Sequence, residues 1–353
     1  MGRFLLRRTL YAIPVIIGIL LVVFLLARAI PGDPCRAALQ ERATDELCDA
    51  YNERYGLNDP IWKQFYIYIG DVAHGDLGQS FRFGVPVTEL LIERLPTTME
   101  LAAAALLLAV AVGVPLGIIS AYRHNSKTDV ATMIGANVGV AMPVFWLGLM
   151  LQYIFAVVLR DTPFALPPSG KLDAGLIPTP FYEVWNLPET GLTQFLSEFT
   201  LANALFTFQG EIFVSAFTHL ILPAVALATI PMAIIARMTR SSLLEVLGRD
   251  YVRTARAKGV PELQVVLKHA LKNAFLPVLS YLGPAAAMAL TGSFVVEKIF
   301  AVPGIGTHFV NAVLSKDLTL IMGVVLVYST ILILFNLVVD VVYRWVDPRI
   351  EVA

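Results

Sequence analysis

The stretch Gly248–Asn273, "GRDYVRTARAKGVPELQVVLKHALKN", is a strongly basic interruption between two apolar segments, each long enough to cross a membrane. It holds six Lys and Arg residues, in a chain that is 57% hydrophobic and only 15% charged. Soluble globular domains are about 45–50% apolar and about 25% charged. These proportions, with a mean hydropathy of +0.71, predict an all-α polytopic membrane protein in which the basic stretch is a polar loop.

Six apolar segments are candidate membrane spans, because a helix rises about 1.5 Å per residue and the hydrocarbon core is roughly 30 Å thick. They are Leu10–Ile30, Leu101–Tyr122, Val130–Leu159, Phe217–Ala236, Phe275–Val296 and Leu318–Tyr343. Pro143 lies inside the third segment, which is either one kinked helix or a span followed by a shorter helix. The sequence therefore predicts six spans, with a seventh helix possible.

The first segment could instead be a cleaved signal peptide, since Ala27-Arg28-Ala29 resembles a cleavage site. The apolar part of a signal peptide is about 7–15 residues long, and this segment is longer. We therefore expect a retained first helix.

The distribution of Lys and Arg predicts the orientation of the spans, since cytoplasmic loops are enriched in these residues. With the amino terminus inside, residues 1–9, 122–129, 237–274 and 344–353 are cytoplasmic and hold 15 basic and 6 acidic residues. The remainder, apart from Asp340, holds 11 basic and 20 acidic residues. Both termini and the basic stretch are therefore expected in the cytoplasm.

Sequence patterns also suggest where helices begin and pack. Thr97 to Glu100 has the form of a capping box and predicts a helix beginning near Leu101. Ser126 to Asp129 is a weaker version before Val130. The pairs Gly113/Gly117 and Gly135/Gly139 have the spacing that lets membrane helices approach closely.

The segment 31–100, expected outside, holds 12 acidic and 6 basic residues and is too long for a plain connector. We expect an external subdomain facing a protein partner. Within it, Trp62, Phe65, Tyr66 and Ile69 have helical spacing. This stripe either lies on the membrane surface or in a packed core, or it contacts a ligand.

The chain carries no motif for a chemical reaction of its own. It has no nucleotide-binding glycine loop, no zinc-protease motif and no nucleophile elbow, and its two cysteines and five histidines leave little room for a metal centre. The middle sections of the predicted spans hold no ionisable residue, whereas ion-coupled carriers place such groups there. The energy for any transport is therefore expected from another polypeptide, which needs a docking surface.

The basic stretch has the pattern of two short helices joined at an exposed elbow. Val252 and Ala255 fall on one helical face, and Gly259 can adopt the left-handed conformation that ends a helix. Pro261 suits the first turn of the next helix. Four further apolar residues form a second helical stripe: Leu263, Val266, Leu267 and Ala270. A solvated positive loop is the alternative to a docking surface.

The sequence "DYVRTARAKGVPELQVVLKHALKNAFLP" resembles the cytoplasmic coupling motif of ABC importer permeases, in the dipeptide and oligopeptide branch. It departs from the general motif of these permeases, with which only Ala255, Gly259 and Leu271 agree. Seven further blocks resemble the same branch, in order along the chain: "IPGDP" (30–34), "HGDLGQS" (74–80), "RLPTTMEL" (94–101), "MPVFWLGL" (142–149), "ARMTRSSLLEVLGRDY" (236–251), "EKIFAVPGIG" (297–306) and "VDVVYRWVDPRI" (339–350).

This resemblance implies the type I ABC importer transmembrane fold and a permease subunit of a peptide importer in the bacterial inner membrane. The expected partners are a second homologous permease, two ATPase subunits that bind ATP and Mg, an external peptide-binding protein and membrane lipid, with no nucleic acid. The chain itself would be no enzyme and hold no cofactor. Another cargo, such as nickel, glutathione, haem or an oligosaccharide, is an alternative within the family; an embedded enzyme or channel is an alternative outside it.

The resemblance implies four parts: the first span (1–30), the external subdomain (31–95), the transmembrane core (96–345) with its coupling loop (237–274), and a cytoplasmic tail (346–353). The residues expected to contact an ATPase are Arg253, Thr254, Ala255, Arg256, Ala257, Lys258 and Gly259.

Two structural pairings are also expected from the residues themselves. Cys35 and Cys48 both fall in the external segment, where oxidising conditions permit a disulfide. Asp340 and Arg344 are four residues apart on the last helix, where they can form an ion pair.

Overall fold

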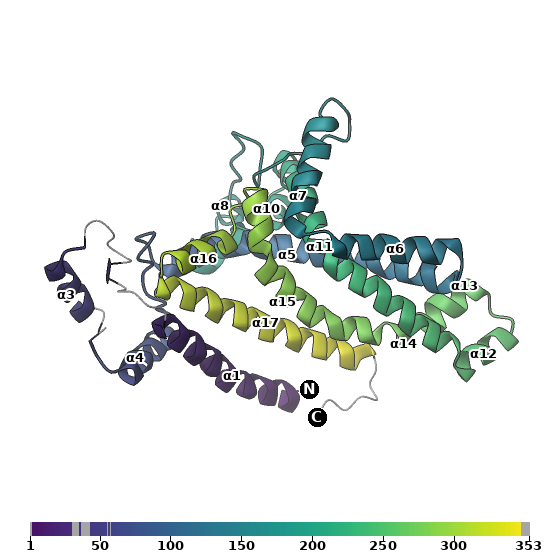
Figure 1. Ribbon diagram of the computed structural model, residues 1–353, viewed down its shortest axis with the longest axis horizontal. Helices are drawn as coiled ribbons and strands as arrows, with labels where there is room; N and C mark the ends of the chain where they lie inside the picture. Colours follow the sequence, from purple (N-terminus) through teal and green to yellow (C-terminus); the bar gives the residue numbers. More distant parts are fainter. Residues whose placement is uncertain (1, 30–34, 37–42, 55, 57, 347–353) are drawn as a thin grey trace. The chain divides into compact units, whose positions relative to one another are not determined.

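The computed structural model describes residues 2–29, 35–36, 43–54, 56 and 58–346, and most of these residues are helical. Figure 1 labels the helices. The chain divides into two compact units. Unit 1 comprises Met1–Thr97, Thr179–Asn203 and Pro303–Ile333. Unit 2 comprises Thr98–Pro178, Ala204–Val302 and Leu334–Ala353. Three helices have residues in both units: α5 (Val87–Tyr122), α10 (Thr200–Phe206) and α17 (Leu318–Val346).

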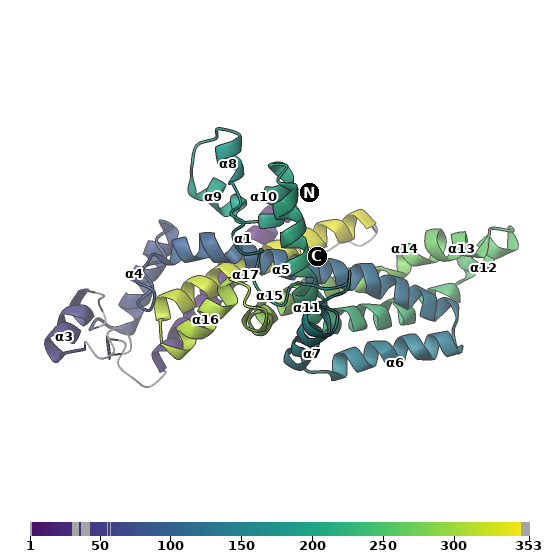
Figure 2. The same ribbon diagram turned by 90° about the horizontal axis from the view of Figure 1, so that it is seen from above.

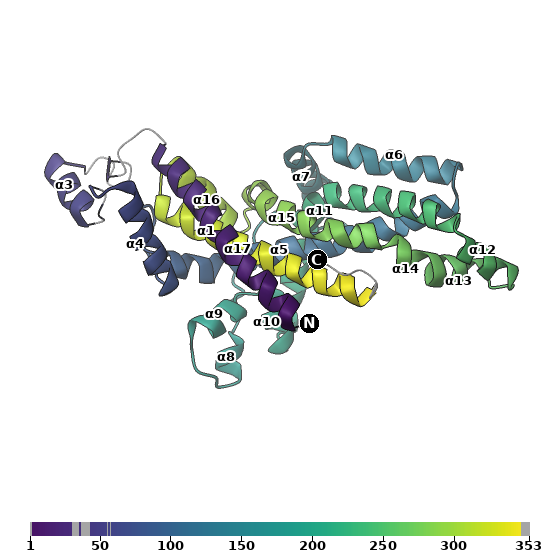
Figure 3. The same cartoon turned by 90° about the horizontal axis from the view of Figure 1, so that it is seen from below.

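The helices wholly within unit 1 are α1 (Gly2–Ala29), α3 (Asp45–Arg54), α4 (Ile61–Ala73), α8 (Phe181–Val184), α9 (Gly191–Ser197) and α16 (Ile305–Leu314). One apolar cluster joins α1, α4 and α17, with Leu20, Phe24 and Met322 buried at its centre. The three helices are labelled in Figure 3. Phe65 and Ile69 of α4 pack against this cluster, whereas Trp62 and Tyr66 are largely exposed. The predicted stripe on this helix is therefore divided between a packed face and an open one.

Two further contacts hold the loops of unit 1 in place. Cys35 and Cys48 are joined by a disulfide, with Cα atoms 5.4 Å apart. The buried carboxylate of Asp317 accepts hydrogen bonds from Ser80 Oγ at 2.5 Å and from the backbone amide of Arg82 at 3.1 Å. It also accepts from the amide of Leu320 at 3.2 Å, in the first turn of α17.

Unit 2 is a helical bundle, in which α11 packs against α6, α7 and α15. Its helices are α6 (Lys127–Ala141), α7 (Val144–Gln152), η2 (Tyr153–Val158), α11 (Gly210–Leu247), α12 (Asp250–Ala257), α13 (Glu262–Gln264), η3 (Val265–Ala270), α14 (Leu271–Ala274) and α15 (Leu276–Ile299). Figure 2 shows α6 alongside α11, with α12 to α14 beyond the end of α11.

Glycines bring α5 and α11 together. A Cβ atom at Gly113 would lie 2.7 Å from the carbonyl oxygen of Met232, and one at Gly117 would lie 2.6 Å from that of Ala236. The predicted close approach at this pair is thus confirmed. In the second pair only Gly139 has a close neighbour, since a Cβ atom there would lie 2.8 Å from a methyl group of Thr229, whereas Gly135 faces open space.

Pro143 divides the third apolar segment into two helices. The chain bends by 101° between Lys127–Ala141 and Val144–Val158. Met142 is extended, with φ −79° and ψ 127°, as expected of a residue before proline. The segment is therefore two helices and not one continuous kinked helix, and neither is long enough to span a membrane alone, as the second alternative required of one of them.

Four helices of the described chain are long and apolar enough to span a membrane: Val87–Tyr122, Gly210–Leu247, Leu276–Ile299 and Leu318–Val342. The bent pair around Pro143 makes five if it crosses as one span. In α1 the apolar stretch Leu10–Leu26 is shorter, so the sixth span stays a prediction. These helices, and the absence of strands from the described residues, agree with the all-α polytopic fold.

The prediction that a capping box at Thr97 begins a helix is wrong. Helix α5 begins at Val87, within the segment assigned to the external subdomain, and passes through Thr97 and Glu100 without a break. The physical reason is that Val87, Leu91 and Leu95 have helical spacing and are all buried. Their packing stabilises helical turns before Thr97. By contrast, Ser126 does cap α6, accepting a hydrogen bond from the amide of Asp129.

Candidate functional site

The basic stretch forms the predicted elbow. Helix α12 ends at Ala257, and Gly259 follows with a φ of 77°, in the left-handed region that glycine adopts without strain. Its amide donates to the carbonyl of Arg256 at 2.9 Å. Pro261 is extended and precedes α13, which starts at Glu262. The chain thus reverses between two short helices at a point where Gly259 is exposed.

Apolar side chains anchor the elbow to the ends of α5 and α11. Val252 and Ala255 of α12 are buried together with Ala121 of α5 and Leu243 of α11. From the second arm, Val265, Val266, Ala270 and Ala274 join the same cluster. Because the elbow shares a core with two long helices, a force on it can reach them through packed side chains.

The second predicted stripe is half right. Val266 and Ala270 are buried, but Leu263 is 69% exposed and Leu267 is 46% exposed. Val265 is buried in their place. The segment Val265–Ala270 is a π-helix, whose wider turn shifts the buried face away from the α-helical spacing used in the prediction.

One ion pair closes the elbow. Arg256 Nη2 and Nε donate to Glu262 Oε1 and Oε2 at 2.6 and 3.0 Å, so the two groups meet in a bidentate arrangement. The hydrogen bonds from Arg256 lower the pKa of Glu262, and those to Glu262 raise the pKa of Arg256. The guanidinium of Arg256 therefore braces the two arms, although the sequence placed it on the docking surface.

Most of the other residues expected to contact an ATPase lie on the surface of the elbow. Arg253, Thr254, Ala257, Lys258 and Gly259 are exposed, whereas Ala255 is buried. Arg253 Nη1 lies 3.6 Å from Asp250 Oδ1, with both side chains largely exposed. Thr254 Oγ1 donates to the carbonyl of Asp250 at 2.9 Å. The elbow presents positive charge and a hydroxyl, which are groups that can bind a partner.

Sequence reasoning missed a second pair at the same ends of the helices. Arg240 Nε and Nη2 donate to the two carboxylate oxygens of Asp129 at 2.7 and 2.8 Å. Asp129 is buried and also accepts from Ser120 and from the amide of Asn125. The pair clamps the start of α6 onto α11. The sequence offered one signal for this pair: acidic Asp129 and basic Arg240 lie next to the predicted cytoplasmic ends of two spans.

A buried carboxyl was also missed. Glu297 of α15 has no exposed surface, and its Oε1 accepts from Thr98 Oγ1 at 2.7 Å and from Ser293 Oγ at 3.0 Å. The predicted span ends at Val296, just before Glu297, whereas the helix continues to Ile299. This contact joins α5 to α15.

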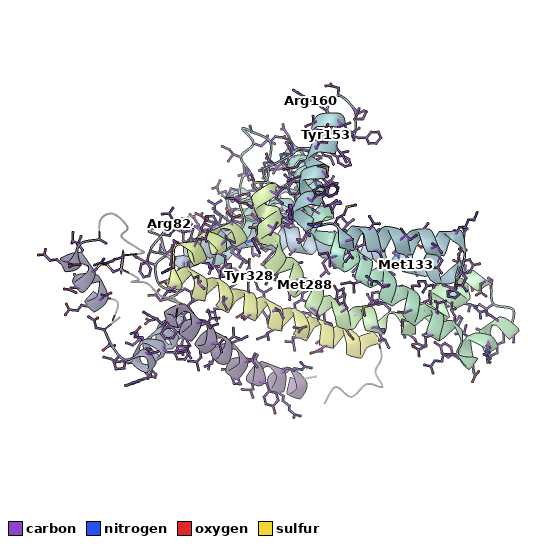
Figure 4. The ribbon with its side chains drawn as sticks, viewed as in Figure 1. Arg82, Met133, Tyr153, Arg160, Met288 and Tyr328 are labelled. Carbon is purple, nitrogen blue, oxygen red and sulfur yellow. A yellow bond between two sulfur atoms is a disulfide. The ribbon has the colours of Figure 1, made fainter. Side chains whose placement is uncertain are left out.

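The bundle of unit 2 also holds an apolar cavity of about 250 Å³. Its walls include Val144 of α7, Pro231 of α11, and Met288 and Gly292 of α15; Met288 is labelled in Figure 4. No charged residue lines it. Among the described residues, no three His, Cys, Asp or Glu side chains are grouped so that they could hold a metal ion.

The expected ion pair of the last helix involves a side chain outside the described residues. Asp340 lies in α17, but the side chain of Arg344 falls outside the described residues, so this ion pair stays a prediction. The tail 346–353 lies outside them too, except for Val346.

The chain matches two family models that together cover nearly all of it. Residues 113–352 match the "binding-protein-dependent transport system inner membrane component" model. Residues 1–102 match the model of the N-terminal part of such membrane components. The chain belongs to this family. It is the membrane component of a transport system, and the resemblance of its eight sequence blocks is thereby confirmed.

Several curated relatives match over almost their whole length. The dipeptide transport system permease protein DppB of Alkalihalophilus pseudofirmus is 44% identical over 98% of both chains. The corresponding DppB of Escherichia coli is 40% identical over 99% of both. The oligopeptide transport system permease protein AppB of Bacillus subtilis is 37% identical over 99% of this chain and 100% of its own.

Proposed function

We propose that this chain is the permease subunit of an ATP-driven importer of dipeptides and other short peptides. The observation that carries the proposal is a sequence identity of 40–44%, over nearly the whole chain, to permeases named for dipeptide transport. The apolar cavity in unit 2 is lined by no carboxylate, imidazole or thiol side chain, so it offers no support for a metal-ion cargo.

The energy would come from partner subunits. The permease works with a second homologous permease, two ATPases that bind ATP and Mg, and an external peptide-binding protein, in a bacterial inner membrane. The chain itself is a transporter subunit without a cofactor. This assignment is supported by the family name, which specifies dependence on a binding protein, and by the lack of a nucleotide-binding motif in the sequence.

The elbow would transmit the motion of an ATPase. Arg253, Thr254, Ala257 and Lys258 offer exposed donors and apolar surface at its tip, while the buried cluster behind them connects to α5 and α11. Because the elbow shares packed side chains with two spans, a shift of the docked ATPase would move both. In this role the elbow and both termini would lie in the cytoplasm, and the excess of Lys and Arg in these segments supports that orientation.

Uptake by the assembled complex tests the cargo. The permease, co-expressed with its neighbouring permease and ATPase subunits, is reconstituted into vesicles with the cognate binding protein. We expect ATP-dependent uptake of radiolabelled dipeptides, and competition by unlabelled dipeptides but not by nickel, glutathione, haem or an oligosaccharide. ATP-dependent uptake of one of these other solutes, without peptide uptake, would assign the alternative cargo.

A charge-reversal pair tests the docking surface. Arg253→Glu with Lys258→Glu should reduce recovery of the ATPases with the permease, most clearly at low salt. The matched control, Lys268→Glu with Lys272→Glu, makes the same charge change on exposed residues of the second arm and should retain more ATPase. Equal recovery in all three proteins would indicate a solvated loop with no docking role.

Labelling tests the orientation. Single cysteines placed at Lys258 and at Asp161, in a background with Cys35 and Cys48 replaced by serine, are treated with an impermeant maleimide in intact spheroplasts. We expect modification at position 161 only. Modification at position 258 from outside would reverse the assigned orientation.

A further inference from the structure

A small lobe in unit 1, residues 179–203, is held rigidly by its own hydrogen bonds. The side chain of buried Asn203 accepts from the amide of Phe181 at 2.8 Å and donates to the carbonyl of Thr179 at 3.0 Å, closing the two ends of the lobe. Thr190 and Thr193 form a reciprocal capping box at the start of α9. Figure 2 shows α8 and α9 joined within this lobe. Its backbone is therefore fixed without help from a partner.

The lobe nevertheless exposes large apolar side chains. Trp185 is 58% exposed and Leu192 is 67% exposed, and the other members of this set are Val184, Leu187 and Leu196. Leu192 and Leu196 are four residues apart on α9 and share one face of it. A loop that leaves a tryptophan and three leucines uncovered by the rest of the chain has the composition of a protein-binding surface. Tryptophan in particular is enriched among the residues that supply most of the binding energy at interfaces.

The charge of the lobe is entirely acidic. It carries Glu183, Glu189 and Glu198, and no Lys or Arg occurs anywhere from position 172 to position 236. Glu183 and Glu189 are exposed beside the apolar residues in sequence. Segments that lie on membranes carry Lys and Arg on their polar face, which bind lipid headgroups. An acidic rim without one basic residue therefore disfavours a lipid surface and favours a protein with basic residues around an apolar patch.

The lobe packs near the beginning of α5, since a Cβ atom at Gly191, at the start of α9, would lie 3.5 Å from Ile92 Cδ1. The distribution of Lys and Arg gives its side of the membrane. Residues 179–203 fall in the part of the chain assigned to the outside, whereas the basic elbow is assigned to the cytoplasm. The outside is where a soluble binding protein delivers its cargo.

We propose that the apolar and acidic surface of residues 183–196 is a docking site for the external binding protein, which meets it with an apolar patch rimmed by Lys and Arg. This inference rests on the proposed function, because that function supplies the binding protein. The rigid backbone favours binding, since little conformational entropy is lost when the partner docks. The carboxylates would speed encounter with a basic surface and would make the affinity depend on salt.

The affinity of the binding protein for the complete importer tests the site. The assembled complex is placed in nanodiscs, and binding of fluorescently labelled, peptide-loaded binding protein is titrated. Leu192→Ser with Leu196→Ser should weaken binding about tenfold or more, since this pair removes two exposed anchors. Glu183→Lys should weaken it at low salt and much less at high salt. Basal ATPase activity should stay unchanged.

The matched controls lie outside the lobe. Phe164→Ser removes an apolar side chain that is 70% exposed, and Asp161→Lys reverses an exposed charge; neither should change the affinity. Unchanged affinity in both lobe variants would overturn the proposal. So would loss of the second permease on purification, which would make that subunit the occupant, or a weaker association of the lobe variants with lipid, which would make it the membrane.

Failure of the proposed function would look different. In that case the wild-type complex would import no peptide and would gain no ATPase activity from the binding protein. Failure of the docking site alone leaves wild-type import intact and both lobe variants as active as wild type at limiting concentrations of binding protein.

Discussion

The seam between α5 and α11 and the elbow that follows α11 both depend on glycine, but for opposite reasons. At the seam, Gly113 and Gly117 have helical backbones, and carbonyl oxygens lie within 2.7 Å of where their Cβ atoms would be. At the elbow, Gly259 has open space around it, and its φ of 77° is what excludes other residues. The seam needs the absence of a side chain, and the elbow needs a backbone conformation.

The two regions also use charge differently. Beside the seam, Asp129 and Arg240 form a bidentate pair in which the carboxylate is buried. At the elbow, the Arg256–Glu262 pair is about 40% exposed on both sides. Buried pairs fix one arrangement of helices, since breaking them leaves a charge without a partner, whereas exposed pairs can exchange their partners for water or for another protein. We therefore expect seam variants to lose stability and elbow variants to lose coupling.

The largest effect is expected at the seam. Gly117→Val would place side-chain carbons against the backbone of Ala236 and the side chain of Thr239, and the helix backbones on either side cannot yield. The cost should be about 3 kcal/mol or more, at the upper end of overpacking. Scanning fluorimetry of the detergent-solubilised protein measures it. Gly135→Val is the control, because Gly135 has nothing within 4 Å; an equal loss there would show that β-branching, and not the seam, is responsible.

A second variant tests whether polar contacts along α5 matter as much as its glycines. Thr98→Val keeps the shape of the side chain but removes the hydroxyl that donates to the buried Glu297. Loss of a donor to a buried acceptor should cost about 2 kcal/mol. Thr132→Val is the control, since Thr132 Oγ1 donates only to carbonyls of its own helix, those of Thr128 and Asp129. Equal melting temperatures for the two variants would contradict this role of Thr98.

At the elbow, Gly259→Val should act on transport more than on folding. A β-branched residue at positive φ costs about 1–2 kcal/mol and would redirect the second arm. We expect normal insertion and yield, with loss of ATP-driven uptake or of the bound ATPases. Gly75→Val introduces the same backbone strain, since Gly75 has a φ of 84° and open space around it, and it should leave the ATPases bound. Normal uptake by Gly259→Val would remove the elbow from the coupling path.

Sequence patterns predicted the elbow and the seam because both depend on local signals. The glycine with proline two positions later predicted the turn at Gly259, and the four-residue spacing predicted the approach at Gly113 and Gly117. The same spacing at Gly135 predicted a contact that is absent, since spacing defines a helix face but not the rotation of that face toward a neighbour. The coupling motif Arg253–Gly259 likewise gave no sign that the side chain of Arg256 would bind Glu262 of the second arm.

The burial of the polar groups could not be predicted from the sequence for a different reason. Glu297 and Asp129 lie at the ends of apolar segments, where a sequence reading assigns charged residues to the water phase. Burial there depends on which helix covers them, α5 for Glu297 and α11 for Asp129, and this is a property of packing between distant segments. The start of α5 at Val87 was not predicted, because the apparent capping box at Thr97 indicated a start near Leu101.

The smallest effect is expected from the exposed pair of the elbow. Hydrogen bonds from Arg256 hold the pKa of Glu262 below its ordinary value near 4.5. A carboxyl whose pKa is lower in the folded state than in the unfolded state stabilises the fold at pH values above the unfolded pKa. That contribution is lost as the pH falls through the folded pKa. Because both side chains are well exposed, it should amount to only a few tenths of a kcal/mol.

The difference in melting temperature between wild type and Glu262→Gln isolates this contribution. At pH 7 the wild type should be slightly more stable, and the difference should shrink as the pH is lowered from about 5 to 3, since a protonated Glu262 and the glutamine that replaces it offer Arg256 similar neutral partners. High salt should shrink it at pH 7 as well. A difference that persists at pH 3, or that exceeds the loss in Thr98→Val, would mean that the elbow is braced as firmly as the buried helices, and the contrast between the two regions would fail.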